Sequence, residues 1–139
     1  MSNIVVDSSV IVKWLNTKNE ANVEKADRIL KDAQLGKIDL IAPELSKYEI
    51  GNALLNKSLK LSQALDALAT SYNLPVTFVP ESQDLAFETY RMSQKFAITY
   101  YDASFVSLAE LLDATLVTDN PKHQAKVKGV EVLPLKNYK

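Results

Sequence analysis

Chemistry in this chain would have to come from its carboxylates, and the first of these directly follows a predicted strand. Asp7 comes after residues 4–6, a short apolar run of isoleucine and two valines. Asp is also a favoured N-cap residue, so a structural role in starting the next helix is the alternative. Ser8 or Ser9 could cap that helix instead, which would leave the carboxylate of Asp7 available for binding or catalysis.

A second acidic residue occupies the same kind of position late in the chain. Asp119 follows the strand predicted at residues 115–117 and is separated from it only by Thr118. The alternative is a turn residue, because Asp-Asn-Pro is a strong turn signal. Neighbouring side chains point in different directions past a strand end, so either Asp119 or Asn120 should face a site there. We expect Asp119, because a carboxylate adds charge that an amide cannot, and Thr118 could hydrogen-bond to its oxygen or to a water.

Two further acidic residues lie on the apolar faces of predicted helices. Glu49 is one turn from both Leu45 and Ala53, and Asn52 shares its face. Asp102 begins a helix and lies along the middle of its apolar stripe, one turn before Phe105 and Val106. A solvent-facing Glu and a first-turn Asp that suits the helix dipole are the structural alternatives. A carboxylate in such surroundings has to be paired, protonated or bound to a metal, because burying an isolated charge is costly.

The four acidic residues together predict a metal-dependent hydrolytic site. Clustered carboxylates repel one another unless a cation lies among them, and ligands that are all oxygen favour Mg or Mn. Such a site activates water and neutralises charge at a phosphodiester. The chain has no cysteine, no glycine-rich phosphate loop and a single histidine, His123, in a basic segment. We therefore expect catalysis and metal binding from Asp7, Glu49, Asp102 and Asp119, supported by Ser8, Asn52, Thr118 and Asn120.

The elements that would position these residues alternate between strands and helices. Short apolar runs predict strands at residues 3–6, 39–42, 76–79, 115–117 and within 129–133. Helical spacing of apolar residues predicts helices at 8–15, 20–35, 43–57, 62–72, 82–95 and 101–112. Pro43 suits a first helical position and Ser62 a cap. This alternation is typical of a three-layer α/β/α sandwich in which helices cover both faces of a central, mostly parallel, short-stranded sheet, and such sheets bind ligands beyond the carboxyl ends of their strands.

Length, hydropathy and charge indicate a single domain that does not cross a membrane. The length suits a single domain spanning residues 1–139. We expect a cytoplasmic protein without a membrane-spanning segment, since no apolar run approaches the roughly 20 residues of a membrane span. The formal net charge of −1 does not by itself suggest nucleic acid. Lysines concentrate in the last third of the chain, and they form either a nucleic-acid contact or an ordinary solvated face.

Three blocks of sequence resemble the PIN-domain nucleases of the VapC toxin type. The first is IVVDSSVIVKW at residues 4–14, and the second runs from PEL to YEIGNAL across residues 43–54. The third comprises YDA to LA at residues 101–109, followed by LVTD at 116–119. Their order and spacing match the family, and together they cover essentially the whole chain.

The resemblance implies a parallel sheet between helices, Mg- or Mn-dependent endonucleolytic cleavage of RNA, a small VapB-like antitoxin as partner, and a homodimer. Asp7, Glu49 and Asp102 match the first three acidic positions of the family. The resemblance also implies that the antitoxin lies over the first two helices, which makes Trp14 and Leu15 candidate contacts. A core position is an equally good explanation for Trp14.

The fourth acidic position departs from the family, which commonly has Thr-x-Asp where this chain has Thr118, Asp119 and Asn120. Either Asp119 reaches the site through a local backbone shift, or Asn120 fills the position as a neutral oxygen ligand. This departure leaves open a catalytically inactive PIN-like module that binds RNA or protein. A housekeeping RNA-processing nuclease with the same site is a further alternative. Phosphatases with a strand-then-Asp motif need a second acid where this chain has Ser9.

Overall fold

The computed structural model describes residues 2–139, which form one five-stranded sheet with helices around it. The strands are β1 (Ser2–Val6), β2 (Ile38–Pro43), β3 (Val76–Val79), β4 (Thr115–Thr118) and β5 (Val132–Pro134). The helices are α1 (Ser8–Leu15), α2 (Val23–Gln34), α3 (Leu45–Leu55), α4 (Leu61–Ser71), α5 (Gln83–Phe96), α6 (Tyr100–Leu111) and α7 (Pro121–Gln124), with a 3₁₀ turn at Leu135–Asn137.

The sheet is parallel throughout, with the strand order β3-β2-β1-β4-β5. Strand β1 is central, and the short strands β3 and β5 form the two edges. Because all five strands run the same way, their carboxyl ends meet at one side of the sheet, where ligands bind in folds of this kind. The predicted three-layer α/β/α sandwich is confirmed.

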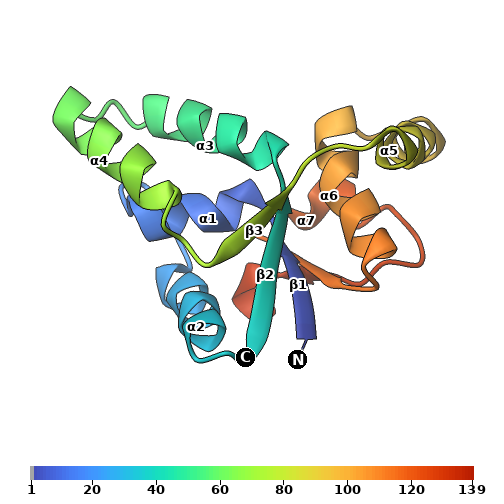
Figure 1. Ribbon diagram of the computed structural model, residues 1–139, viewed down its shortest axis with the longest axis horizontal. Helices are drawn as coiled ribbons and strands as arrows, with labels where there is room; N and C mark the ends of the chain where they lie inside the picture. Colours follow the sequence, from blue (N-terminus) through green and yellow to red (C-terminus); the bar gives the residue numbers. More distant parts are fainter. Residues whose placement is uncertain (1) are drawn as a thin grey trace.

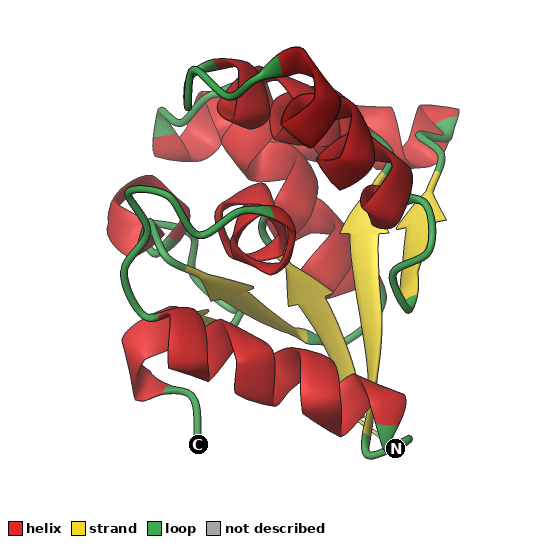
Figure 2. Cartoon of the chain, turned by 90° about the vertical axis from the view of Figure 1, so that its left-hand side faces the viewer, coloured by secondary structure: helices red, strands yellow, loops and turns green. Residues whose placement is uncertain are grey.

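Alternating side chains of the central strands divide the core between the two faces of the sheet. Ile4 and Val6 of β1 pack with α1, α2 and α3, whereas Val5 packs with α5 and α6. Figure 1 shows the corresponding layers, with α1–α4 on one side of the sheet and α5 and α6 on the other. In Figure 2, α2 crosses in front of the strands, and α3 and α4 lie above the carboxyl ends of the strands. Within the described residues, no helix is both long enough and apolar enough to cross a membrane.

Four local predictions differ from the structure. Pro43 ends β2, pairing in register with Val79, so that α3 begins only at Leu45. Helix α2 begins at Val23 and not at residue 20, because the backbone of Asn22 is left-handed (φ 56°), a conformation that a right-handed helix cannot include. Helix α4 begins one residue before the predicted Ser62 cap. The short helix α7 was not predicted, because its Asn-Pro start was interpreted only as a turn.

Candidate active site

A cavity of about 700 Å³ opens at the carboxyl ends of the strands, and we call it the carboxylate cavity. It collects side chains from α1, α3, α6 and the segment after β4, which are far apart in the sequence. Three of the predicted acidic residues line it. Its lining consists of Asp7, Ser8, Ser9, Val12, Leu45, Tyr48, Glu49, Asn52, Ala53, Asn56, Tyr101, Asp102, Asn120 and Gln124.

Asp7 both caps a helix and lines the cavity. Its backbone is extended at the end of β1, and its Oδ2 accepts a hydrogen bond of 2.9 Å from the backbone N–H of Ser9. Asp7 is therefore the N-cap of α1, and neither Ser8 nor Ser9 takes that role. Oδ1 accepts a second hydrogen bond, of 3.1 Å, from Nε2 of Gln124. These two contacts hold the carboxylate in one orientation at the cavity wall.

Glu49 reaches the same cavity from α3 and is held by a serine relay. Ser8 Oγ donates to Glu49 Oε1 over 2.8 Å, and the Oγ atoms of Ser8 and Ser46 are 2.7 Å apart. Because the Ser8 proton goes to the carboxylate, Ser46 has to donate to Ser8. Ser46 is fully buried, so this relay fixes α3 against the start of α1. Asn52 lies on the exposed side of α3 and also lines the cavity.

Asp102 lies in the first turn of α6 but does not cap that helix. Thr99 is the N-cap, and its Oγ1 accepts a hydrogen bond of 3.0 Å from the backbone N–H of Asp102. Capping therefore does not account for the Asp102 side chain, which lines the cavity. Gln124 also connects this residue to Asp7, since its Nε2 is 3.5 Å from the backbone oxygen of Asp102.

The electrostatics of the cavity are those of crowded carboxylates. Burial raises the pKa of Asp7, and the charge of Asp102 adds to that increase, although hydrogen bonds from Ser9 and Gln124 act against it. Burial also raises the pKa of Glu49, with further contributions from the charges of Asp7 and Asp102. Both raised values reflect unfavourable ionisation, which a cation among the three groups would relieve.

The donor set suits a hard divalent ion, but not as an all-carboxylate cage. Within residues 2–139, no three side chains of Asp, Glu or His are arranged so that they could hold one metal ion together. Magnesium usually keeps several waters and is bound through one or two carboxylates. The lining residues that could bind a metal offer only oxygen ligands, and burial raises the pKa of Asp7 and Glu49, so the site fits this partly hydrated mode of binding.

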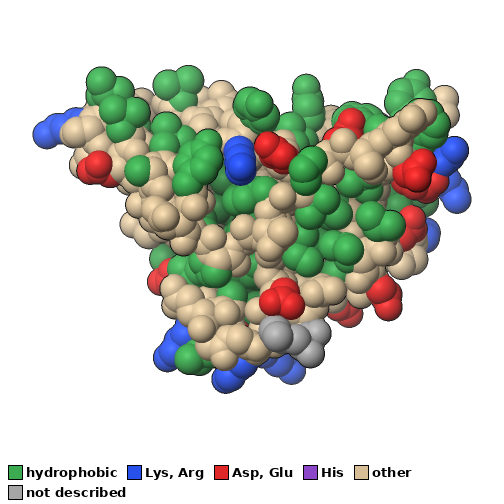
Figure 3. All heavy atoms as spheres, viewed as in Figure 1, with side chains coloured by type: hydrophobic (Ala, Val, Ile, Leu, Met, Phe, Trp, Pro, Cys, Tyr) green, Lys and Arg blue, Asp and Glu red, His purple; other side chains and the backbone are tan. Residues whose placement is uncertain are grey.

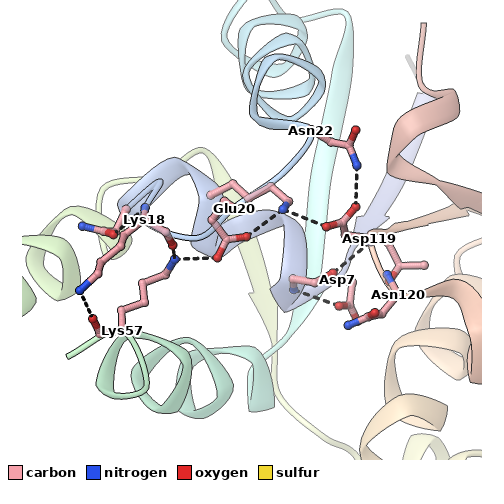
Figure 4. Close-up of polar contacts among 11 residues, drawn as sticks. Asp7, Lys18, Glu20, Asn22, Lys57, Asp119 and Asn120 are labelled. Atoms are coloured by element: carbon pink, nitrogen blue, oxygen red, sulfur yellow. Dashed lines mark hydrogen bonds and ion pairs between the residues drawn. The ribbon is translucent and has the colours of Figure 1, made fainter. Parts of the chain in front are cut away.

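The structure separates the two candidates for the fourth position. Asp119 does not line the cavity: its Oδ2 is 2.9 Å from Nζ of Lys13, and its Oδ1 accepts a hydrogen bond of 3.2 Å from Asn22. Figure 4 shows Asp119 turned towards Asn22. Asn120 is exposed and lines the cavity. Thr118 is fully buried, and its Oγ1 accepts a hydrogen bond from the Asn120 backbone, so it shapes this turn from outside the cavity.

A buried ion-pair network explains the orientation of Asp119. Lys13 of α1 has a side chain that is only 1% exposed, and its Nζ contacts both Asp119 and Glu20, the latter at 2.8 Å. Lys57, just after α3, contacts the other oxygen of Glu20 at 2.7 Å. We call these four residues the lysine network, and much of it is drawn in Figure 4. The sequence-based prediction missed it, because no local pattern pairs residues so distant in the chain.

Trp14 and Leu15 are partly buried against the core cluster between the sheet and α1–α3. The indole N–H of Trp14 donates a hydrogen bond of 2.7 Å to the backbone oxygen of Ala26 in α2. The geometry of Trp14 is therefore that of a core residue that joins two helices. A role of either residue in antitoxin binding remains a proposal.

Gln124 is the functional candidate that sequence analysis missed. It is 1% exposed, lies at the end of α7 and contacts both Asp7 and Asp102. Its Oε1 is the one buried side-chain polar atom without a hydrogen-bond partner among the described residues. Pro121 at the start of α7 was the available signal, because proline favours the first helical position.

Comparisons with known proteins find similar folds. The chain is similar in structure to VapBC2 from Rickettsia felis bound to a promoter DNA fragment, with a TM-score of 0.73, 17% identity, and 95% and 98% of the two chains covered. It is similar to PAE2754 from Pyrobaculum aerophilum, with a TM-score of 0.66 and 24% identity; the match covers 95% of this chain and 90% of PAE2754. It is also similar to VapC20 from Mycobacterium tuberculosis, a toxin that cleaves the sarcin–ricin loop. That match has a TM-score of 0.66 and 16% identity, and it covers 88% of this chain and 93% of VapC20.

These likenesses establish the fold, and a family model establishes the relationship. A comparison with curated protein sequences gives no match. The PIN domain model matches residues 4–130, which include every residue of the carboxylate cavity. The chain therefore belongs to the PIN domain family.

Proposed function

We propose that this chain is a magnesium- or manganese-dependent endoribonuclease and the toxin of a toxin–antitoxin pair. The observation that carries the proposal is the convergence of Asp7, Glu49 and Asp102 on one cavity at the carboxyl ends of the strands. Burial raises the pKa of Asp7 and Glu49, with smaller contributions from the charges of the neighbouring carboxylates, and this supports a cation at the site. Costly clusters of this kind are typical of functional sites.

Each cavity residue then has a task in phosphodiester hydrolysis. Asp7 and Asp102 would hold the metal, and Asn120 would add a neutral oxygen. When bound, the divalent ion stabilises charge on the phosphodiester and makes water acidic enough to attack near neutral pH. Glu49 Oε1 accepts from Ser8, which leaves Oε2 to take a proton from the attacking water. Gln124 keeps the Asp7 carboxylate in its orientation.

The comparisons support RNA as the substrate and an antitoxin as the partner. The similar Mycobacterium tuberculosis protein is described as cleaving the sarcin–ricin loop, and the Rickettsia felis and Klebsiella pneumoniae structures are a VapBC assembly and a toxin–antitoxin complex. The exposed residues Lys122, Lys126 and Lys128 follow Asn120 and supply positive charge that suits a phosphate backbone. We also propose a homodimer, which size-exclusion chromatography with light scattering would test.

Cleavage of single-stranded RNA by the purified, antitoxin-free protein tests the central claim. We expect cleavage with Mg²⁺ or Mn²⁺ and none in EDTA. Asp7→Asn and Asp102→Asn should each lower the rate by at least about a hundredfold, because several kcal/mol of charge stabilisation are lost. Asp113→Asn, the same change at an exposed acid outside the cavity, is the matched control. Equal cleavage in EDTA would overturn the metal mechanism.

Asn120 favours a second candidate function, an inactive module that binds RNA without cutting it. An amide in the fourth position removes one charge from the cation site that the PIN family usually completes with an acid. Binding of RNA without cleavage by the wild type, together with cleavage by Asn120→Asp, would establish this alternative. A small open reading frame beside the gene would separate a toxin from a housekeeping nuclease.

A further inference from the structure

A second cavity, of about 250 Å³, adjoins the carboxylate cavity, and we call it the side cavity. Three residues line both cavities: Leu45 and Tyr48 from α3, and Tyr101 from α6. The side cavity continues towards the end of β3 and the start of α5. Its volume lies below the roughly 300–1,000 Å³ of sites for whole small ligands, so it suits a single ring system.

Aromatic rings stand at the boundary between the two cavities. Tyr48 of α3 is 78% exposed, and Tyr101 of α6 is 59% exposed. Hydrophobic side chains also gather over α3 and α5 on the face shown in Figure 3. Exposed aromatic faces beside a nuclease site are suited to stacking on unpaired bases, and such stacking is the general means of holding single-stranded nucleic acid.

The polar groups of the side cavity select against phosphate and in favour of a base. The rim carries two carboxylates, Glu44 and Glu81, which repel a phosphodiester. Tyr100 Oη donates to Glu81 Oε2 over 2.8 Å, which fixes this carboxylate, and Oε1 makes no hydrogen bond within residues 2–139. A fixed carboxylate accepts N–H groups from a base edge. Guanine presents two such donors side by side, N1–H and the exocyclic amine, and therefore matches a carboxylate best.

We propose that the side cavity binds a guanine base adjacent to the phosphodiester that occupies the carboxylate cavity. Tyr48 and Tyr101 would stack on the base, and Glu81 would accept its N–H groups. This assignment rests on the proposed ribonuclease function and deepens it, because it makes the chain a nuclease with a base preference next to the cut. Glu81 is a specificity residue in this scheme, and Tyr101 contributes affinity for any base.

Cleavage kinetics on four short RNAs test the proposal, the RNAs differing only in the base next to the cut. The wild type should show the highest kcat/KM with guanine, and Glu81→Gln should reduce that preference about tenfold, equivalent to ~1.4 kcal/mol. Tyr101→Leu should raise KM for all four RNAs. Tyr90→Leu and Glu110→Gln, exposed residues outside both cavities, are the matched controls. A wild type without base preference, a Glu81→Gln variant that keeps the wild-type preference, or a Tyr101→Leu variant with wild-type KM values would refute the assignment.

Binding of nucleoside monophosphates in EDTA, followed by saturation-transfer NMR, separates the side cavity from the nuclease activity. Guanosine monophosphate should bind the wild type, and it should bind Tyr101→Leu and Glu81→Gln much more weakly. This result without any RNA cleavage would retain the base site and reject the proposed function. Cleavage without guanine preference or monophosphate binding would reject the base site alone. A Tyr101→Leu variant that dissociates to monomers while its KM values and its binding of guanosine monophosphate stay at the wild-type level would refute the base site and assign this surface to contacts between copies.

Discussion

Replacing Lys13 by methionine should destabilise the protein strongly, although Lys13 lies outside the carboxylate cavity. Methionine keeps most of the length of the side chain and removes the ammonium. The change leaves Asp119 with only Asn22 and leaves Glu20 with only Lys57. Removing one partner of a buried ion pair costs about 3–5 kcal/mol, because the other charge stays buried without compensation.

The low end of that range applies here. Glu20 keeps one lysine, and the side chain of Asp119 is 25% exposed, so water can reach it. We therefore expect a loss of about 3 kcal/mol in the free energy of unfolding, which for a domain of this size lowers Tm by roughly 10 °C. Urea unfolding followed by circular dichroism in EDTA measures it. Lys126→Met, at an exposed lysine, should change stability by no more than about 0.5 kcal/mol.

The pH dependence follows from the same network. Burial alone would raise the pKa of Glu20, but hydrogen bonds from Lys13 and Lys57 outweigh it and hold the value below its ordinary 4.5. Burial alone would lower the pKa of Lys13, and its bonds to Glu20 and Asp119 raise it instead. Because the pKa of Glu20 is lower in the folded protein than in the unfolded chain, its ionised carboxylate stabilises the fold, and this stabilisation is lost as pH falls through the folded-state pKa. The difference between wild type and Lys13→Met should therefore shrink below about pH 4.5.

A second-site change provides the decisive control. Adding Asp119→Asn to Lys13→Met removes the carboxylate that the first change leaves without its cation, so part of the lost stability should return. No recovery in the double variant, or a loss below about 1 kcal/mol in Lys13→Met, would refute the view that the network stabilises the fold through these charges.

Three other changes test the site and its surroundings. Asp7→Asn should raise Tm in EDTA by roughly 3 °C at neutral pH, because it removes a buried charge. This gain in Tm should be smaller near pH 4. Because the pKa of Asp7 is raised in the folded protein, the wild type loses stability as pH rises from the ordinary value of 3.8 towards the folded-state pKa, whereas the Asn variant does not. Isothermal titration should show tighter Mn²⁺ binding for Asn120→Asp and little change for Asp119→Asn; the opposite order would place Asp119 in the site. Trp14→Phe should lower Tm by a few degrees through loss of one hydrogen bond, and unchanged melting would reopen a surface role for the indole.

The positions of three acidic residues could be predicted because they depend on regular structure. A residue that directly follows a strand of a parallel sheet must lie at its carboxyl edge, which places Asp7 at the site before any coordinates are known. Glu49 and Asp102 follow from helical periodicity. Strand β3 matches its predicted range because Pro75 and Pro80 bound it on both sides.

The remaining features depend on contacts between distant segments. The choice between Asp119 and Asn120 is decided by Lys13, which lies over a hundred residues earlier in the chain. Glu20 satisfies a helical pattern, yet the left-handed Asn22 separates it from α2, and its side chain contacts Lys13 and Lys57. Gln124 belongs to a single helical turn that is too short to produce a periodic signal. Sequence patterns report local preferences, and these three positions are determined by tertiary charge and hydrogen-bond contacts.

The two short edges of the sheet affect how the protein behaves at high concentration. An exposed edge strand is a template on which another chain can add a strand, and long flat edges promote aggregation. Here β3 offers four residues between two prolines, and β5 offers three residues and ends in Pro134. Proline cannot donate to a neighbouring strand, so neither edge supports an extended intermolecular ladder. The native chain should therefore resist edge-to-edge polymerisation.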